Sequence, residues 1–319
     1  MNSSETPPLL VWEVTPRCNL DCAFCYNVWH STGAKKPAEL QGSDLPTLIN
    51  AIADSGPASV TLTGGEPLLR RDLEDIAAAL SEMGILTGVA TNGVLLTDGR
   101  AEALVRAGVS WFDVSVVSLK EEVYAELTGF HVLSEVKRSL AAVRRSGARL
   151  SVSHVVTSMN HLETAGVIDL ANAFGAESVS LNRFVPGGRG KNSLHLLPDR
   201  NQLQRAVDDA EEAARNTPGL TVSWTIPVEP CLYRLKDDPA AGFGPCRCGS
   251  LKWALDPAGN LRTCEQNPEI LGNLLADPLK DLACSPSAES FRGSDMSPLC
   301  KDCPDEGRCG GGCRFTLSP

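Results

Sequence analysis

The stretch Cys18-Asn-Leu-Asp-Cys22-Ala-Phe-Cys25 brings three thiols together within eight residues. Thiolates at such short spacings can converge on one inorganic centre, and cysteine is the usual ligand of [4Fe–4S] clusters, which normally take four. Because this motif supplies three, one iron would remain for a ligand that is not protein. The same cysteines could instead hold zinc with a fourth ligand from elsewhere, or they could be unrelated buried thiols.

Composition limits the class of protein. The 319 residues are enough for one large domain and a smaller one. The net charge of −10 argues against a broad nucleic-acid surface, since phosphate binding needs clustered Lys and Arg, but it leaves a basic peptide possible. No apolar run approaches the ~20 residues that cross a bilayer, and the first residues lack a secretory signal. We therefore expect a cytoplasmic protein with no nucleic-acid and no membrane partner.

The distribution of the 12 cysteines also favours metal binding. Three lie between residues 18 and 25, none between 26 and 230, and nine between 231 and 313. In a reducing compartment, cysteines grouped in this way indicate metal or catalytic use and not a disulfide framework.

Short apolar runs alternate with helical patterns from Leu9 to about Phe184. Strands are expected at residues 9–15, 59–63, 85–91, 111–117, 149–157 and 178–184, and helices at 44–54, 72–83, 97–107, 134–146 and 161–173. Six strand–helix units predict an α/β fold with a parallel sheet and helices outside. Right-handed crossovers would curl this sheet into a partial barrel, because eight units are needed to close one.

Further motifs follow the strands of this predicted barrel. Thr63-Gly64-Gly65-Glu66-Pro67 ends the second strand, Thr91-Asn92-Gly93 ends the third, and Ser115 lies near the end of the fourth. Paired glycines let the backbone approach a ligand closely, and the acid offers an oxygen to an ammonium group. Each motif by itself is only a turn signal, but functional loops of parallel barrels leave the same ends of the strands.

The cysteine spacing together with the GGEP, TNG and serine motifs resembles the radical S-adenosylmethionine (SAM) enzymes. The resemblance implies a partial (β/α)6 TIM-like barrel and a [4Fe–4S] cluster on Cys18, Cys22 and Cys25 whose open iron is chelated by SAM. It also implies SAM contacts at Phe24, Gly64, Gly65, Glu66, Asn92 and Ser115. The chain departs from the family pattern at Val117, where an aspartate is common, and at Thr128, where an arginine is common.

Two further polar side chains lie in the predicted strands. Because Val117 and Thr128 replace the aspartate and arginine that are common in the family, Arg183 is a candidate replacement partner for the SAM carboxylate. It could equally contact substrate or lie on the surface. His154 lies within the fifth predicted strand and is expected to be a hydrogen-bonded core residue.

The C-terminal cysteines have a second spacing, Cys248-x10-Gly259-x4-Cys264 followed by Cys300-x2-Cys303-x5-Cys309-x3-Cys313. Residues 256–260 predict a hairpin turn between the first two of these cysteines. With Gly272-Asn273-Leu274, this pattern resembles the SPASM extension of radical SAM enzymes, which carries auxiliary iron–sulfur clusters. A zinc ribbon is the alternative.

The SPASM resemblance implies two ligand sets. Cys248, Cys264, Cys313 and one upstream cysteine (Cys246, with Cys231 less favoured) would bind the first auxiliary [4Fe–4S] cluster. Cys300, Cys303 and Cys309 would bind the second, and the later cysteine that completes it in relatives has no counterpart before Pro319. Four possibilities remain open for the fourth ligand of this cluster. Cys284 could fold back, an oxygen or nitrogen side chain could substitute, one iron could stay open, or the cluster could be absent.

The expected organisation is a radical SAM core at residues 1–190, a linker helix and strand at 191–230, and a SPASM-like domain at 231–319. The resemblance implies reductive cleavage of SAM to a 5′-deoxyadenosyl radical, which abstracts hydrogen from substrate, with an electron donor such as flavodoxin or ferredoxin. The favoured substrate is a ribosomally synthesised peptide or protein that is modified oxidatively. The alternatives are oxidation or epimerisation of a small molecule, such as an aminosugar-like metabolite or a tetrapyrrole, and a non-catalytic iron–sulfur or zinc protein.

Overall fold

A single sheet of eleven strands organises the computed structural model, which describes residues 7–293, 300 and 302–316. Its order is β11-β10-β9-β1-β2-β3-β4-β5-β6-β7-β8. The strands are β1 (Leu9–Thr15), β2 (Ser59–Gly64), β3 (Leu86–Thr91), β4 (Val109–Ser115), β5 (Arg149–Val156), β6 (Ser178–Arg183), β7 (Thr221–Trp224), β8 (Ala241–Gly242), β9 (Lys252–Leu255), β10 (Asn260–Arg262) and β11 (Gly272–Asn273). All pairs from β9 and β1 through to β8 are parallel, and β10 pairs antiparallel with both of its neighbours.

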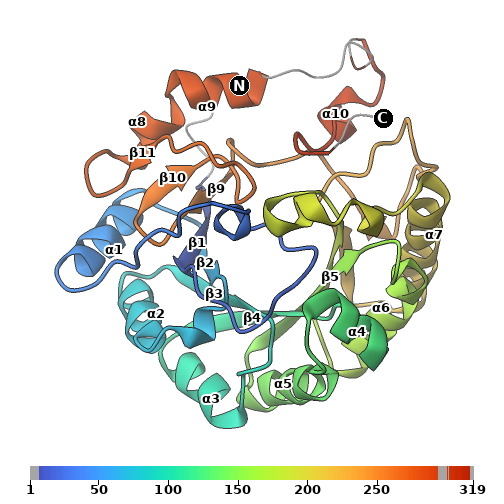
Figure 1. The fold of residues 1–319 in the computed structure, drawn as a ribbon, viewed down its shortest axis with the longest axis horizontal. Coiled ribbons are helices and arrows are strands. Elements are labelled where there is room, and N and C mark those ends of the chain that lie inside the picture. The colour runs from blue at the N-terminus through green and yellow to red at the C-terminus, as the bar shows by residue number, and fades with distance from the viewer. Residues whose placement is uncertain (1–6, 294–299, 301, 317–319) are drawn as a thin grey trace.

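Helices surround the curved sheet on its outer side (Figure 1). They are α1 (Asp44–Asp54), α2 (Leu73–Glu82), α3 (Asp98–Arg106), α4 (Glu121–Thr128), α5 (Leu133–Ser146), α6 (Thr164–Ala173) and α7 (Arg200–Asn216), followed in the tail by α8 (Leu279–Ala283), α9 (Pro286–Gly293) and α10 (Glu306–Cys309). The predicted partial α/β barrel with helices outside is therefore confirmed.

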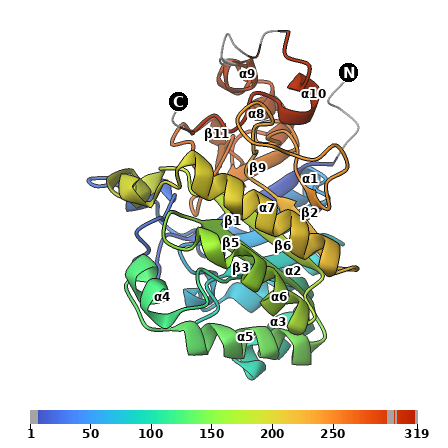
Figure 2. The same ribbon diagram turned by 90° about the vertical axis from the view of Figure 1, so that its right-hand side faces the viewer.

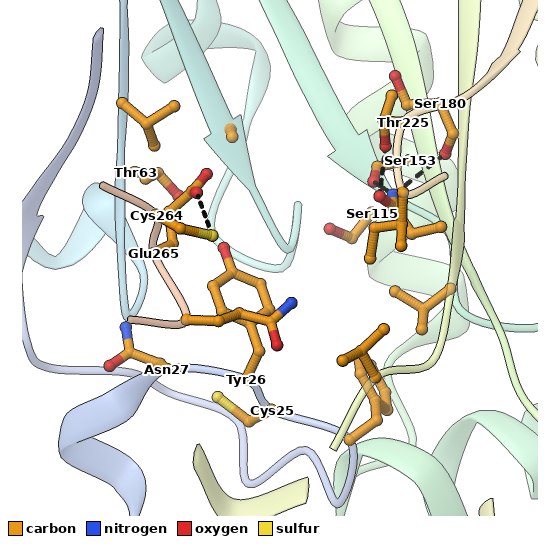
Figure 3. Close-up of a pocket in the computed structure, with 18 of the residues that line it drawn as sticks. Cys25, Tyr26, Asn27, Thr63, Ser115, Ser153, Ser180, Thr225, Cys264 and Glu265 are labelled. Atoms are coloured by element: carbon orange, nitrogen blue, oxygen red, sulfur yellow. Dashed lines mark hydrogen bonds between the residues drawn. The ribbon is translucent and has the colours of Figure 1, made fainter. Parts of the chain in front are cut away.

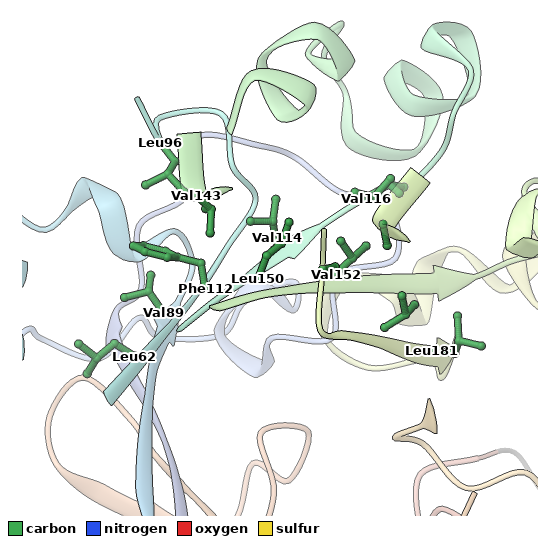
Figure 4. Close-up of a cluster of buried hydrophobic side chains, with 14 of the residues drawn as sticks. Leu62, Val89, Leu96, Phe112, Val114, Val116, Val143, Leu150, Val152 and Leu181 are labelled. Atoms are coloured by element: carbon green, nitrogen blue, oxygen red, sulfur yellow. The ribbon is translucent and has the colours of Figure 1, made fainter. Parts of the chain in front are cut away.

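Alternation along the strands separates a helix-facing core from a barrel interior. Side chains such as Phe112, Val114, Leu150 and Val152 are buried on the helix side, where they form the apolar cluster of Figure 4. Residues between them on the same strands point the other way, because successive side chains of a strand alternate in direction. The inner face consequently belongs to different residues, and several of them, such as Asp113, Ser115, Ser153 and Ser180, carry polar side chains.

Most predicted elements agree with the structure to within a few residues, and two differ more. The fourth strand covers Val109–Ser115 and not 111–117, and Val116 and Val117 follow it as buried residues outside the strand. Helix α4 was not predicted. It begins with two acids and ends at Gly129, whose φ of +84° is a common helix C-cap conformation.

The tail completes the sheet at the N-terminal strand. Strand β9 pairs parallel with β1, from Leu9 opposite Lys252 to Trp12 opposite Leu255, and the predicted hairpin turn joins β9 to β10. Arg262 of β10 forms a buried ion pair with Glu13 of β1. These contacts fix the cysteine-rich tail directly beside the strand that leads into the Cys18–Cys25 loop (Figure 2).

Parts of the expected linker also belong to the sheet, since β7 pairs with β6. The proposed domain limits at 190 and 230 remain a proposal. Within the described residues, no helix has both the length and the apolar character needed to cross a membrane.

Candidate active site

The Cys18–Cys25 loop rests on the backbone of the glycine-rich turn that follows β2. The amide of Gly65 donates to the Thr15 carbonyl at 2.7 Å, and the amide of Glu66 donates to the Arg17 carbonyl at 2.7 Å. A Cβ atom on Gly65 would overlap the Arg17 carbonyl group and would lie 3.1 Å from Cβ of Cys18. Gly65 is therefore needed for close packing against the cysteine loop itself.

A second glycine-rich loop, residues 186–190, supports the cysteine loop after β6. The amide of Gly190 donates to the Cys25 carbonyl at 3.0 Å. Arg189 forms an ion pair with Asp21, with Nη1 2.5 Å from Oδ1, and donates to the Cys22 carbonyl at 3.4 Å. Nothing local in the sequence shows that this segment returns to residues 21–25.

The three thiols of this loop lie in one shared environment. Burial raises the pKa of Cys22 well above its ordinary value, and the neighbouring Cys25 and Cys18 raise it further. Burial also raises the pKa of Cys25, to about 11, whereas the positive charge of Arg189 acts in the opposite direction. Thiols of this kind give up their protons when a metal binds, and Arg189 offsets part of the resulting negative charge.

Glu66 is fully buried and its side chain organises the next loop. Its carboxylate accepts hydrogen bonds from Thr91 Oγ1 at 2.7 Å, from the Asn92 amide at 2.8 Å and from the Leu68 amide at 3.1 Å. Burial raises its pKa to about 7, although these hydrogen bonds oppose the shift. Asn92 in turn donates to Asn19 Oδ1 at 2.8 Å, so the TNG turn is tied to the cysteine loop.

These loops border a cavity of about 500 Å³ inside the barrel. Its volume is within the range of small-molecule sites. Of the predicted cofactor contacts and metal ligands, it is lined by Cys18, Cys22, Phe24, Cys25, Gly64, Gly65, Asn92, Ser115, Arg183, Cys246, Cys248, Cys264 and Cys313. The N-terminal cysteine loop and the first predicted set of tail cysteines therefore face the same space.

Hydroxyl groups line the wall of the cavity opposite the cysteines. Figure 3 shows Ser115, Ser153, Ser180 and Thr225 on one side, facing Tyr26 and Cys264 on the other. Asp113 of β4 also lines this cavity. Burial raises its pKa to about 6, and its Oδ1 has no hydrogen-bond partner among the described residues. An alternating strand pattern could have indicated these inward positions, but the sequence alone did not show that they face one cavity.

The first set of tail cysteines is close together. Sγ of Cys248, Sγ of Cys264 and a carboxylate oxygen of Glu265 lie within 4.8 Å of one another. A hydrogen bond with Cys248 lowers the pKa of Cys246 to about 6. Burial raises the pKa of Cys313 to about 11, and the charges of Cys264 and Cys246 add to this. Cys248 and Cys264 are thus adjacent, and Cys246 and Cys313 line the same cavity.

A cation accompanies this set as well. Lys252 Nζ lies 2.7 Å from a carboxylate oxygen of Glu265. Burial lowers the pKa of Lys252, but Glu265, Cys248 and Cys264 outweigh this, so that its pKa is well above the ordinary value. Each of the two sets of cysteines that face the cavity therefore has a half-buried positively charged side chain beside it. Arg189 accompanies the Cys18–Cys25 loop, and Lys252 accompanies the tail cysteines.

Arg183 lies at the cavity wall but is engaged by another residue. It is buried and forms a two-bond ion pair with Glu229, in which Nη1 lies 2.8 Å from Oε2. Its Nε has no partner among the described side chains and backbone groups. His154 is buried, with Nδ1 2.8 Å from the Val116 carbonyl oxygen, as expected for a core residue.

Comparisons with known proteins agree with this site. The model of the radical SAM superfamily matches residues 12–171, and the SPASM model, an iron–sulfur cluster-binding domain, matches residues 246–304. A PqqA peptide cyclase of Gluconobacter oxydans (strain 621H) is 30% identical over 97% of this chain and 86% of the relative. The PqqA peptide cyclase of Methylocella silvestris is 29% identical over 97% of this chain and 83% of the relative.

Solved structures share the fold. Streptococcus suis SuiB bound to S-adenosylmethionine aligns with a TM-score of 0.76 at 18% identity, over 97% of this chain and 73% of that one. The protein anSMEcpe with bound AdoMet aligns with a TM-score of 0.72 at 16% identity, over 97% and 86% of the two chains. Together with the family models and the curated relatives, the site shows that the chain belongs to the radical SAM superfamily and carries a SPASM iron–sulfur cluster-binding domain.

Proposed function

We propose that this radical SAM enzyme oxidatively modifies a side chain of a ribosomally synthesised peptide inside the barrel cavity. The family's cofactors are SAM and [4Fe–4S] clusters. The observation that carries the proposal is the single cavity of about 500 Å³ that joins the Cys18–Cys25 loop, a hydroxyl-lined wall and the first set of tail cysteines. This arrangement suits a reaction that begins at one iron site and delivers an electron to another.

The residues around the cavity fit the cofactors. Cys18, Cys22 and Cys25 would hold the cluster that binds SAM, and burial of their thiols explains why metal is needed to deprotonate them. The SAM contacts would come from Phe24, Gly64, Gly65, Asn92 and Ser115, which line the cavity. Glu66 would act through its backbone, because its carboxylate is occupied by the TNG turn. Arg183 would have only its Nε free for SAM.

Once bound, SAM and the reduced cluster supply a 5′-deoxyadenosyl radical that removes a hydrogen atom from substrate. The protein's part is to hold the substrate carbon in the cavity, to exclude bulk water and to orient the two iron sites. Cys246, Cys248, Cys264 and Cys313 would hold an auxiliary [4Fe–4S] cluster, which would supply an electron acceptor beside the substrate. A flavodoxin or ferredoxin would supply the first electron.

The peptide assignment is supported by the relatives. Two curated relatives that are 30% and 29% identical to this chain are named PqqA peptide cyclases. A structure of SuiB with its precursor peptide SuiA has the same fold as this chain, with a TM-score of 0.71. The net charge of −10 of this chain suits a peptide with basic residues.

Anaerobic reconstitution tests the proposal. Reduced protein incubated with SAM should release 5′-deoxyadenosine, and Cys18→Ala should abolish the release. Short peptides encoded beside this gene should lose the mass of two hydrogen atoms in the same reaction. A protein that loads iron and sulfide but never cleaves SAM would contradict the enzymatic role. SAM cleavage that changes a metabolite and leaves every such peptide intact would contradict the peptide substrate.

A further inference from the structure

Strand β4 carries an acidic side chain deep inside the barrel. Because side chains of a strand alternate in direction, Trp111, Asp113 and Ser115 point to the same side of the sheet. The Trp111 indole lies directly over Gly88 of β3, where a Cβ atom would overlap the ring, and the Arg149 guanidinium lies 5.7 Å from the centroid of that ring. Asp113 therefore lies between an aromatic floor and the hydroxyl group of Ser115.

The neighbours of Asp113 across the sheet are small and leave its carboxyl group at the cavity wall. Ala90 of β3 lies opposite it on one side and also lines the cavity, and Ser151 of β5 lies opposite it on the other side. A hydrogen bond from Ser151 acts to lower the pKa of Asp113. The second carboxylate oxygen, Oδ1, receives no hydrogen bond from the described part of the chain.

No positive charge of the protein compensates this carboxylate. Burial and Ser151 are the influences on its pKa, and no basic side chain of the described residues is among them. Arg183, another residue of the cavity wall, is already paired with Glu229. A buried carboxylate without a charged partner costs free energy, so this position is unfavourable for the protein alone.

The rest of this wall is uncharged. Ser115, Ser153, Ser180 and Thr225 contribute hydroxyl groups (Figure 3), and Val117 and Val155 contribute methyl groups. By strand geometry Asp113 lies about 7 Å deeper along β4 than Ser115, which is one of the expected SAM contacts. A ligand that reaches Asp113 must therefore extend past the strand ends into the barrel.

A cationic nitrogen on a flexible stem fits these conditions. An ammonium or guanidinium group supplies both the missing charge and the missing hydrogen bond, and such charge-assisted bonds are stronger than neutral ones. Lysine and arginine side chains carry this group on an apolar stem of three or four methylene groups, which can pack along valine side chains.

We propose that Asp113 binds the cationic end of a basic side chain of the peptide substrate. The inference rests on the proposed function, since it names the kind of side chain that the same cavity takes. Asp113 is then a specificity-determining residue that selects peptides with a lysine or arginine near the reacting carbon. It also explains why an unpaired acid is retained in the barrel, because residues that lower stability are characteristic of functional sites.

Binding of two small probes to the anaerobically reconstituted protein with SAM gives the first test. Nα-acetyl-lysine N-methylamide and Nα-acetyl-norleucine N-methylamide differ in the ammonium group that Asp113 would bind. In calorimetric titrations at pH 7.5, we expect wild type to bind the lysine probe about 10–100 times more tightly, as for a hydrogen bond to a charged group. Asp113→Asn, which keeps the shape of the side chain, should lose this preference. Asp169→Asn, at an exposed position on α6, should retain it.

Peptide turnover gives the second test, as a double-mutant cycle. In a peptide that the enzyme modifies, each lysine in turn is replaced by norleucine and each arginine by citrulline. At one position the replacement should lower kcat/KM of wild type about 10–100-fold, the same loss that Asp113→Asn causes with the unchanged peptide. The two changes together should cost no more than either alone, because they remove the same contact.

Three results would overturn the inference. They are equal affinities of wild type for the two probes, a preference for the lysine probe that persists in Asp113→Asn, and strictly additive losses in the peptide cycle at every basic position. A loss of SAM affinity in Asp113→Asn as large as the loss of peptide turnover would also count against it, since the carboxylate would then serve the cofactor. An Asp113-dependent preference for the lysine probe, in an enzyme that modifies no peptide, would instead support the cation site and contradict the proposed peptide substrate.

Discussion

Replacing Asp113 with asparagine should stabilise the protein at neutral pH. Asp113 points into the barrel cavity, and burial raises its pKa from the ordinary 3.8 to about 6. At 1.36 kcal/mol per pKa unit, this difference corresponds to a cost of about 3 kcal/mol for keeping the carboxylate ionised at pH 7. Because the group faces a cavity that water can enter, we expect a gain of about 1–3 kcal/mol for Asp113→Asn.

The pH dependence gives this prediction its sign. The carboxyl group is protonated more readily in the folded than in the unfolded protein. The favourable contribution of this group to the free energy of unfolding is therefore fully present below pH 3.8 and is lost as the pH rises through about 6. The advantage of Asp113→Asn over wild type should be largest at pH 7–8 and should fall by about half at pH 5.

Thermal denaturation of anaerobically reconstituted protein measures this effect. For a chain of this length the gain corresponds to a rise in Tm of roughly 2–5 °C at pH 7.5. Asp169→Asn, at an exposed position on α6, is the matched control and should leave Tm unchanged. An Asp113→Asn variant with unchanged or lower Tm at pH 7.5, or with a gain that does not shrink at pH 5, would refute the reasoning.

Two further substitutions test packing and the junction between barrel and tail. Gly88→Ala should lower stability by about 1–3 kcal/mol, because its Cβ would overlap the Trp111 indole. Gly99→Ala is the control and should not lower stability, because a Cβ there meets open space. Equal melting temperatures of the two variants would contradict this. Arg262→Met should cost about 3–5 kcal/mol by leaving Glu13 buried without its partner. The double variant Glu13→Gln/Arg262→Met should recover most of that loss in the same melting assay, and a double variant as unstable as the single one would contradict the ion-pair explanation.

The parts of the molecule that the sequence predicted are those with local signals. Strand β1 and helix α1 have the predicted bounds. The signals that define them, an apolar run and a proline near the first helical turn, are contained within a few residues of the sequence. The cysteine, GGEP and TNG motifs were likewise correctly placed at strand ends, where the structure brings them together around one cavity.

The contacts that the sequence could not predict join distant segments. The pair Arg183 and Glu229 is separated by 46 residues, and Arg189 reaches a carbonyl 167 residues away. The hydrophobic periodicity of the sequence does not reveal such pairings, because they depend on how the sheet curves in three dimensions. The role of the Glu66 carboxylate was missed for a related reason: two of its three hydrogen-bond donors, Thr91 and Asn92, lie at the end of the next strand.

The pairing of β9 with β1 has a consequence for biosynthesis. One edge of β1, at residues 9–12, receives its partner only when residues 252–255 have been made. A nascent chain on the ribosome therefore exposes unpaired backbone groups beside apolar side chains for most of translation, and such edges are prone to aggregation. We therefore expect chaperone protection of this first strand, until β9 has emerged, to raise the yield of folded enzyme.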